Sequence, residues 1–578
     1  MKKLPILILA SFALGLTPAA LAEKPAPKLP TPPEVWKDYN PDAGDFKEEI
    51  ISEGTKDGIY SKDSYISAYV NGEEVRVFCK YAVKADAKKA PGLLVVHGWT
   101  SAPGIDKEFL NDGWAVLAHD YCGKADGRPH YTKYPEALRH GNMNDKANRV
   151  KAKFPDGKDI TDPKQTDDYL WYAIQRRALS YLLAQKEVDK TRVGAKGYSY
   201  GGSLMWNLGM DSRVKAVVTY FGSGWTDFYR DKGLFMYKVP YVEPPKTPGE
   251  ELLLSAITPE AHAPFITAPT FWLNGSNDHH GGHERGETNF KKFQPGVPFS
   301  FAHQARGQHD TWKLGKGAKL WLEKYVLGKD VDWPARPVSE IRLGADGVPE
   351  FHIKPGSPDK IEALDVFYAY KEPFNCARLW MDAKTEKKGD KWVAKIPVHN
   401  VDDYVFAFAN IRYPGEIVIS SDFTAAIPAK LGKAVATKVF AADGSESWTN
   451  VDPVEVAGAK GIRSNNPHEA ACMLFGEASR KAPEGAVMVF EFHCTQPQTF
   501  SLVANGRYSA DFEIQGSNDW QTLEIPAGQL RFLGDRDPLK SWSEATSVAL
   551  KAKIAPGVTS NITWITFKDP KWKVPGKN

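Results

Sequence analysis

Short apolar runs alternate with helical patterns between residues 64 and 328. The runs at 93–96, 114–118 and 214–220 are mostly apolar, whereas residues 167–188 place apolar side chains at helical spacing. Strands of this buried type, separated by helices, are typical of a parallel sheet covered on both faces. The hydrophobic pattern therefore predicts a doubly wound, mostly parallel α/β domain.

A hairpin and three later strands complete this pattern. Residues 64–70 and 74–83 are strand-like and are joined by Asn71-Gly72, a strong short-range signal for a β-hairpin. Further strands are expected at 191–196, 269–273 and 299–302, with a closing helix over 310–327. Two stretches, 124–164 and 223–263, interrupt the alternation, and insertions of this kind commonly cover a substrate site.

The pattern changes after residue 332 to short strands with little helical periodicity. Residues 338–422 predict a compact antiparallel sandwich, and residues 423–578 predict a second, larger sandwich of the jelly-roll type. The expected strands lie at 363–370, 392–398 and 403–411 in the first unit, and at 487–493, 499–504, 509–514, 520–525, 547–553 and 561–567 in the second.

The N-terminus has the order of a secretory signal peptide. Basic residues follow Met1, an apolar run extends over 4–16, and Ala20-Leu21-Ala22 forms a small-residue cleavage site. We therefore expect cleavage after Ala22 and a secreted or periplasmic protein without a membrane anchor. Residues 23–45 are rich in Pro, Lys and Ala and predict an extended leader rather than a folded element.

Charge and cysteine content exclude several other classes of function. With 74 basic and 71 acidic residues, the precursor carries a net charge of only +3, which indicates neither nucleic acid nor an anionic membrane as a partner. The 5 cysteines form no C-x-x-C motif, so no structural zinc is expected, and Cys472 and Cys494 could either form a disulfide or stay reduced. No cofactor is indicated, and the oligomeric state is not predicted.

The strongest chemical motif is Gly197-Tyr-Ser-Tyr-Gly201, between a predicted strand and a predicted helix. G-x-S-x-G in this context is a nucleophile elbow, and its serine needs a base and an acid that follow in the order acid, then histidine. Asp278 comes after the strand at 269–273, and His309 comes after the strand at 299–302. We therefore predict the catalytic residues Ser199, Asp278 and His309 at one edge of the sheet.

An oxyanion hole requires two backbone N–H groups near the serine. The sequence offers those of Tyr200, directly after Ser199, and of Trp99, after His97-Gly98 at the end of a buried strand. His97 is expected to shape this loop without transferring a proton.

These motifs together resemble the α/β-hydrolase superfamily. Residues 64–328, within a catalytic domain placed at 46–332, are similar to its dienelactone hydrolase and acetyl xylan esterase-like branch. The matching pieces are Leu93-Leu-Val-Val-His-Gly-Trp99, Gly113-Trp-Ala-Val-Leu-Ala-His-Asp-Tyr-Cys-Gly123, Lys196-Gly-Tyr-Ser-Tyr-Gly-Gly202, Asn274-Gly-Ser-Asn-Asp278 and His309. The resemblance implies a serine nucleophile where dienelactone hydrolases proper have cysteine, which favours an ester substrate.

Two further resemblances concern the elbow and the C-terminal units. The elbow is also similar to that of prolyl oligopeptidase-like secreted peptidases, which keeps an amide substrate open. The last unit resembles a carbohydrate-binding jelly roll, through Ser517-Asn-Asp-Trp-Gln-Thr-Leu-Glu-Ile-Pro526, Leu539-Lys-Ser-Trp542 and Ile562-Thr-Trp-Ile-Thr-Phe567. The unit before it looks Ig-like.

Several other residues have a functional and a structural interpretation. The histidines His279, His280 and His283 could bind a metal or form a polar loop at the mouth of the site, where we place His279 and His280 as substrate contacts; no metal site is predicted. His303 competes with His309 as the base, but its place on a strand favours a structural role. The aromatic residues of the second insertion could bind an acyl group or sugar, or only pack: Trp225, Phe228 and Tyr229. Trp520, Trp542 and Trp564 could stack on sugars, although core packing is favoured.

The sequence therefore predicts a secreted serine esterase acting on a small-molecule or polysaccharide ester. Two alternatives stay open: a secreted serine peptidase, in which Glu250-Glu251 could hold a substrate N-terminus, and a polysaccharide-binding protein that has lost catalysis.

Overall fold

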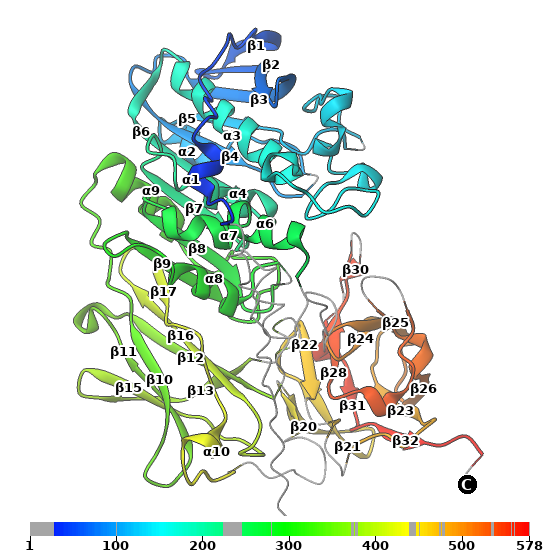
Figure 1. The fold of residues 1–578 in the computed structure, drawn as a ribbon. Helices are drawn as coiled ribbons and strands as arrows, with labels where there is room; N and C mark the ends of the chain where they lie inside the picture. Colours follow the sequence, from blue (N-terminus) through cyan, green and yellow to red (C-terminus); the bar gives the residue numbers. More distant parts are fainter. Residues whose placement is uncertain are drawn as a thin grey trace, which may run out of the picture.

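The computed structural model describes residues 28–576, apart from 100, 126, 224–245, 279, 372–374, 376–377, 379, 438–446, 450, 473–474, 477–479, 533–536, 556–557 and 560. An α/β domain is followed by two β-rich units (Figure 1). Within this described part, no helix combines the length and the apolar character needed to cross a membrane.

A nine-stranded sheet in the order β1-β2-β3-β5-β4-β6-β7-β8-β9 forms the centre of the α/β domain. Its strands are β1 (Glu49–Lys56), β2 (Ile59–Val70), β3 (Glu73–Lys84), β4 (Ala90–Val96), β5 (Ala115–His119), β6 (Val188–Tyr198), β7 (Ala216–Tyr220), β8 (Thr270–Gly275) and β9 (Phe299–Gln304). The predicted hairpin is present, because β2 and β3 pair antiparallel around Asn71-Gly72. From β5 to β9 every neighbouring pair is parallel. The predicted doubly wound fold is confirmed.

Helices cover both faces of this sheet. They are α2 (Lys107–Asn111), α3 (Asp167–Ala184), α4 (Tyr200–Leu208), α6 (Pro248–Ala256), α7 (Pro259–His262), α8 (His283–Phe290) and α9 (Gly317–Leu327), with 3-10 turns η1 (Glu136–Gly141), η2 (Lys146–Asn148), η3 (Pro163–Gln165) and η4 (Ala263–Phe265). One apolar core contains Leu170 of α3 and Leu204 of α4, and a second contains Phe109 of α2 and Trp321 of α9. The closing helix starts at Gly317 rather than at Asp310, because residues 310–316 form turns.

The expected extended leader is partly wrong. Residues Pro32–Trp36 form the helix α1, which starts at the capping residue Thr31. Trp36 is buried and stacks on Tyr169 of α3, with the Arg176 guanidinium 4.5 Å from its ring centroid. Composition predicted an extended segment here, but the tertiary contacts of one tryptophan fold it onto the catalytic domain.

The second unit is a sandwich of two antiparallel sheets, β10-β11-β15-β14 and β13-β12-β16-β17 with β18 beside β16. Its elements are β10 (Val338–Leu343), β11 (Pro349–Lys354), β12 (Ala363–Tyr370), β13 (Met381–Ala383), β14 (Thr385–Lys388), β15 (Lys391–Lys395), β16 (Val405–Tyr413), β17 (Ile417–Ser420), β18 (Thr424–Ala426) and α10 (Pro428–Leu431), with η5 (Pro358–Lys360). Since β18 belongs to this sheet, the sandwich extends beyond the boundary expected at residue 422.

This sandwich lies directly against the α/β domain, with β17 beside the edge strand β9 (Figure 1). The His303 N–H donates to Ser420 Oγ at 2.7 Å, and Asn410 Nδ2 donates to the His303 carbonyl oxygen at 2.9 Å. The sandwich therefore covers the edge of the sheet that carries the predicted histidine.

The third unit contains two six-stranded antiparallel sheets. They comprise β19 (Trp448–Thr449), β20 (Val451–Val456), β21 (Ala459–Ser464), β22 (Glu469–Cys472), β23 (Val487–His493), β24 (Gln498–Ala504), β25 (Tyr508–Ile514), β26 (Gln521–Pro526), β27 (Arg531–Phe532), β28 (Val548–Ala552), β31 (Thr566–Phe567) and β32 (Lys571–Lys573), with η7 (Ala527–Gln529), η8 (Trp542–Glu544) and η9 (Ile562–Trp564); a separate ribbon joins β29 (Ile554–Ala555) and β30 (Val558–Thr559). Within the strand expected over 561–567, Ile562–Trp564 form the turn η9 and Thr566–Phe567 form the strand β31.

The cysteines and tryptophans of this unit are mainly structural. Cys472 and Cys494 are both buried and no disulfide joins them, so the disulfide alternative is not realised. Trp542 is fully buried and donates to the Ile525 carbonyl oxygen, whereas Trp564 is 50% exposed. Of the three tryptophans considered for stacking on sugars, Trp564 has the most exposed ring and Trp520 is partly buried.

Candidate active site

Ser199 lies on a sharp turn between β6 and α4. Its backbone has φ 56° and ψ −119°, a left-handed conformation that is costly for a residue with a side chain. A Cβ on Gly197 would collide with the Gly201 carbonyl, and one on Gly201 would collide with the His97 carbonyl. The two glycines therefore allow the strained turn, and the predicted strand–turn–helix context of the elbow is present.

Asp278 and His309 form a hydrogen-bonded pair. The fully buried Asp278 follows β8, and its Oδ2 lies 2.5 Å from His309 Nδ1 on the loop after β9. Its Oδ1 accepts from the backbone N–H groups of His280 at 2.6 Å and Gly281 at 2.5 Å. Three hydrogen bonds fix this carboxylate, and His309 is held by Nδ1, the arrangement in which Nε2 of a catalytic histidine acts as the base.

Phe221 connects this pair with Ser199. The Ser199 N–H donates to the Tyr220 carbonyl oxygen at 3.0 Å. Phe221 directly follows Tyr220 in the chain. Its ring centroid lies 4.0 Å from that of His309. The predicted residues therefore lie at the carboxyl ends of β6, β8 and β9, on one edge of the sheet, and β7 with Phe221 after it lies between β6 and β8. No sequence signal marked Phe221, because an apolar residue after a buried strand is ordinary.

The predicted oxyanion loop lies against the elbow. A Cβ on Gly98 would be 3.2 Å from the Ser199 Cβ, so Trp99 follows a residue that almost touches the serine. Tyr200 is the first residue of α4, and the first N–H groups of a helix have no acceptor within it. Both backbone amides are thus placed near Ser199, and their role as oxyanion donors stays a prediction.

A buried polar cluster around His97 and Asp120 packs against the oxyanion loop. His97 Nδ1 lies 2.7 Å from the Gly98 carbonyl oxygen, and His97 Nε2 lies 3.3 Å from Asp120 Oδ1. Arg128 donates to the same carboxyl at 2.8 Å. Burial opposes ionisation of Asp120, but His97 and Arg128 outweigh it and hold the pKa of this carboxyl below its ordinary value.

The same cluster does not suit a metal. Donor atoms of His97, Asp120 and Cys122 come within 4.8 Å of one another. However, the Arg128 guanidinium donates to both Asp120 and the Cys122 sulfur. A fixed cation already occupies the place that a metal ion would need, so we interpret the cluster as a support for the loop.

Charged side chains on the first insertion form one wall of the site. Tyr200 donates its hydroxyl to Asp168, and Lys151 Nζ lies 2.6 Å from both Asp168 Oδ2 and the Tyr200 oxygen. Burial and the Asp168 charge raise the pKa of the Tyr200 hydroxyl well above its ordinary value, so it stays a donor. Arg149 lies 5.3 Å from the ring centroid of Trp99, whose side chain is 43% exposed. Sequence reasoning missed Arg149 and Lys151, which lie in a polar stretch without periodicity, and Asp168, which lies at the start of a predicted helix.

The structure separates the predicted histidines. His280 is buried, and its ring lies parallel to that of Tyr200 at 6.2 Å. His303 is fully buried and packs on His283, with 3.8 Å between ring centroids. Burial lowers the pKa of His303 to about 3, so it is neutral and shielded from substrate. This environment supports the structural interpretation of His303.

Four of the remaining predicted substrate contacts cannot be placed, and a fifth residue caps a helix. Trp225, Phe228, Tyr229 and His279 lie outside the described residues. Glu250 accepts from the Thr247 N–H at 2.8 Å in a capping box at the start of α6. The peptidase alternative needed a carboxylate that faces the substrate, whereas this one caps a helix.

Residues 78–303 match the model of the dienelactone hydrolase family. This segment is a dienelactone hydrolase-family domain. It contains the elbow and Asp278, and the match ends just before the His309 loop and the β-rich half of the chain. The α/β domain is accordingly a hydrolase domain.

Solved structures with similarity to this chain include three hydrolases. Acetyl xylan esterase 1 from Thermoanaerobacterium sp. JW/SL YS485 is 19% identical with a TM-score of 0.37, over 49% of this chain and 88% of that one. Acetyl xylan esterase from Paenibacillus sp. R4 is 18% identical with a TM-score of 0.36, over 47% and 85%. A putative dienelactone hydrolase from Klebsiella pneumoniae subsp. pneumoniae MGH 78578 is 15% identical with a TM-score of 0.28, over 43% and 87%. No curated protein sequence matches the chain.

Proposed function

We propose that this protein is a secreted serine esterase that removes acyl groups from carbohydrate esters. The observation that carries the proposal is the hydrogen bond between Asp278 and His309, 2.5 Å long, beside a strained serine elbow. A buried carboxylate that orients a histidine beside the serine of a nucleophile elbow is the arrangement that activates a hydroxyl nucleophile.

The reaction would proceed in two steps, acylation of Ser199 and hydrolysis of the acyl-enzyme. Ser199 Oγ attacks the ester carbonyl while His309 Nε2 takes its proton, and the Trp99 and Tyr200 amides bind the developing oxyanion. His309 then gives the proton to the leaving alcohol, which departs as an acyl-serine forms. Water, deprotonated by His309, then attacks this acyl-enzyme. The carboxylic acid leaves, and His309 returns the proton to Ser199 Oγ.

The wall of the site supports a substrate with a polar ring. Trp99 presents an exposed aromatic ring next to the elbow, the Arg149 guanidinium lies 5.3 Å from its ring centroid, and Lys151 binds the hydroxyl of the neighbouring Tyr200. An apolar surface with a few fixed polar groups suits a sugar, which has an apolar ring face and many hydroxyls. The N-terminal sequence supports export.

An acetate ester of a chromogenic phenol tests the chemistry directly. Ser199→Ala should lose at least about 10⁴-fold in kcat while keeping its circular dichroism spectrum, because the nucleophile is gone. The matched control is Ser203→Ala, which removes a buried hydroxyl four residues along the same helix and should keep activity. Residual activity of Ser199→Ala near the wild-type level would refute the proposal.

Substrate class is tested with the wild-type protein. Acetylated xylan, longer acyl esters and an aminoacyl anilide are compared at equal enzyme concentration, and acetyl release from the polysaccharide is the expected result. Preferred cleavage of the anilide would replace the esterase by a peptidase. Failure to react with a fluorophosphonate probe, together with binding to xylan, would favour the non-catalytic alternative.

A further inference from the structure

The second unit contacts both loops that carry the catalytic acid and base. The contacts come from Asn375, Arg378 and Trp380, which lie between β12 and β13, and from Asp382 on β13. One group of hydrogen bonds reaches the loop after β8, which holds Asp278. Another reaches the loop after β9, which holds His309.

The contacts to the acid loop are reciprocal. Asn277 Nδ2 donates to the carbonyl oxygens of Asn375 at 3.0 Å and Arg378 at 2.6 Å. In return, Asn375 Nδ2 donates to the carbonyl oxygen of Asp278 itself at 2.6 Å. Asn375 is only 4% exposed, so this hydrogen bond is shielded from competing water. The backbone of the catalytic acid is therefore held by an amide side chain from another domain.

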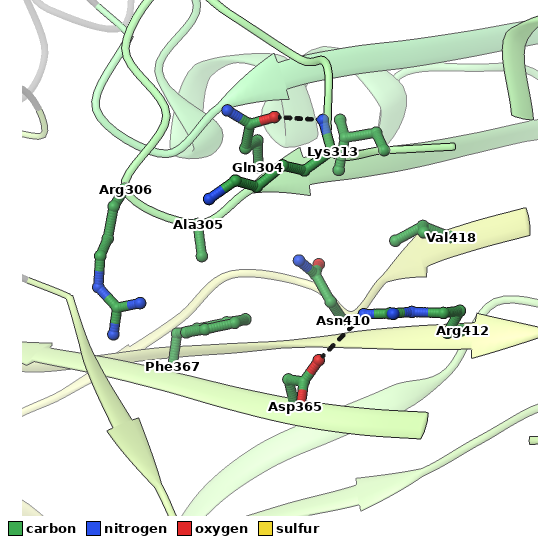
Figure 2. Close-up of a pocket in the computed structure, with 10 residues that line it drawn as sticks. Gln304, Ala305, Arg306, Lys313, Asp365, Phe367, Asn410, Arg412 and Val418 are labelled. Carbon is green, nitrogen blue, oxygen red and sulfur yellow. Dashed lines mark hydrogen bonds and ion pairs between the residues drawn. The ribbon is translucent and has the colours of Figure 1, made fainter. Parts of the chain in front are cut away.

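The contacts to the histidine loop run through Arg306. Its Nε donates to the Trp380 carbonyl oxygen at 2.8 Å, and its NH2 group pairs with Asp382 at 2.5 Å. Figure 2 shows Arg306 extending from the loop toward the sandwich, beside Phe367. A cavity of about 200 Å³ lies next to this contact and is lined by residues of both domains. Beside the cavity, side chains such as that of Arg306 provide part of the contact between the His309 loop and the sandwich.

We propose that Asn375 is a positioning residue for the esterase reaction, and that the sandwich thereby forms part of the catalytic framework. This inference rests on the proposed function. Asp278 orients His309 through the 2.5 Å hydrogen bond to Nδ1, so a displacement of the Asp278 backbone displaces the base. Small errors in the placement of a catalytic group cost about 10²-fold in rate.

The matched control is Asn410, which also donates from its side-chain amide across the same interface. Its acceptor is the His303 carbonyl oxygen on β9 at 2.9 Å, away from the Asp278 loop. Both substitutions by alanine remove one hydrogen bond between the domains. Only the substitution of Asn375 removes a bond to the catalytic acid.

The experiment compares Asn375→Ala, Asn375→Asp and Asn410→Ala with the full-length wild type. A fluorophosphonate titration first counts the reactive serines, so that kcat refers to correctly folded sites only. On an aryl acetate, both Asn375 variants should lose about 10- to 100-fold in kcat per titrated site, with KM within about twofold. Asn375→Asp keeps the size of the side chain but places a carboxylate against the Asp278 carbonyl oxygen, so its loss should be at least as large as that of Asn375→Ala. Asn410→Ala should keep its kcat.

The outcomes separate the two proposals. If the wild type neither reacts with the probe nor hydrolyses the ester, the proposed function has failed. If the wild type is active and the Asn375 variants keep its kcat per titrated site, the sandwich is only a neighbour and the positioning role is refuted. Equal losses in Asn375→Ala and Asn410→Ala would also refute it, since they would indicate a general effect of loosening the interface.

Discussion

Gly201 packs so closely against the backbone of His97 that a methyl group on its Cα would overlap the His97 carbonyl oxygen. This contact joins the start of α4 to the oxyanion loop, and it fixes how close Trp99 lies to Ser199. The glycine after the nucleophile is therefore required by the neighbouring loop as well as by the turn.

Gly201→Ala should consequently damage the site more than the fold. Overpacking of this kind costs about 1–3 kcal/mol of stability, and displacement of the oxyanion loop should lower kcat by about 10²-fold. Ester hydrolysis and thermal unfolding measure the two effects. Gly54→Ala on β1, where a Cβ would meet nothing within 4 Å, is the control and should leave kcat unchanged. Full activity of Gly201→Ala would contradict the described packing.

The assignment of Asp278 as the acid can be tested by comparing it with Asp310, the carboxylate next to His309 in the sequence. Asp278→Asn should lower kcat by roughly 10⁴-fold, because an amide cannot hold the histidine tautomer that the reaction needs. Asp310 instead accepts from the Gln308 N–H at 3.1 Å, so Asp310→Asn should keep kcat within about tenfold. Steady-state hydrolysis of an aryl acetate measures both. The reverse order of effects would show that the acid has been misassigned.

The helix α1 should contribute to the stability of the catalytic domain. Trp36→Ala removes a buried ring that stacks on Tyr169 at 4.6 Å, and truncation of a buried aromatic costs about 3–5 kcal/mol. A domain of this size should then unfold at least roughly 6 °C lower in differential scanning calorimetry. The same change at the half-exposed Trp564 is the control and should shift its own transition by less. An unchanged transition would mean that residues 32–36 do not pack as described.

Strand ends and motif order predicted that Ser199, Asp278 and His309 lie at one edge of the sheet, because a parallel sheet gathers its carboxyl ends there, and their catalytic roles stay a prediction. Two kinds of residue could not be found in this way. Trp36 lies in a proline-rich segment whose composition hides one long-range contact. Asn375 lies 97 residues from Asp278 in the chain, and only the packing of two domains brings them together. Sequence patterns describe local periodicity, whereas these contacts depend on how separate units dock.

The contact between the two domains should be sensitive to acid through His303. This ring is fully buried among Trp272, His283 and Phe408, and burial lowers its pKa to about 3. Between pH 3 and 6.5 the unfolded chain therefore binds a proton at His303 that the folded protein does not. Stability then rises with pH across this window and falls on acidification, by up to about 1.4 kcal/mol per pH unit for one such group.

His303→Phe keeps a planar ring and removes this titration. Between pH 6.5 and 5 the variant should lose about 2 kcal/mol less unfolding free energy than the wild type, measured by denaturant titration at each pH. The buried His283, whose pKa burial and His303 also lower, contributes with the same sign in both proteins. Burial raises the pKa of Glu287, which contributes with the opposite sign in both. The difference between the two curves therefore reports His303 together with the part of the His283 shift that His303 causes, and parallel curves would show that His303 already carries a proton in the folded protein.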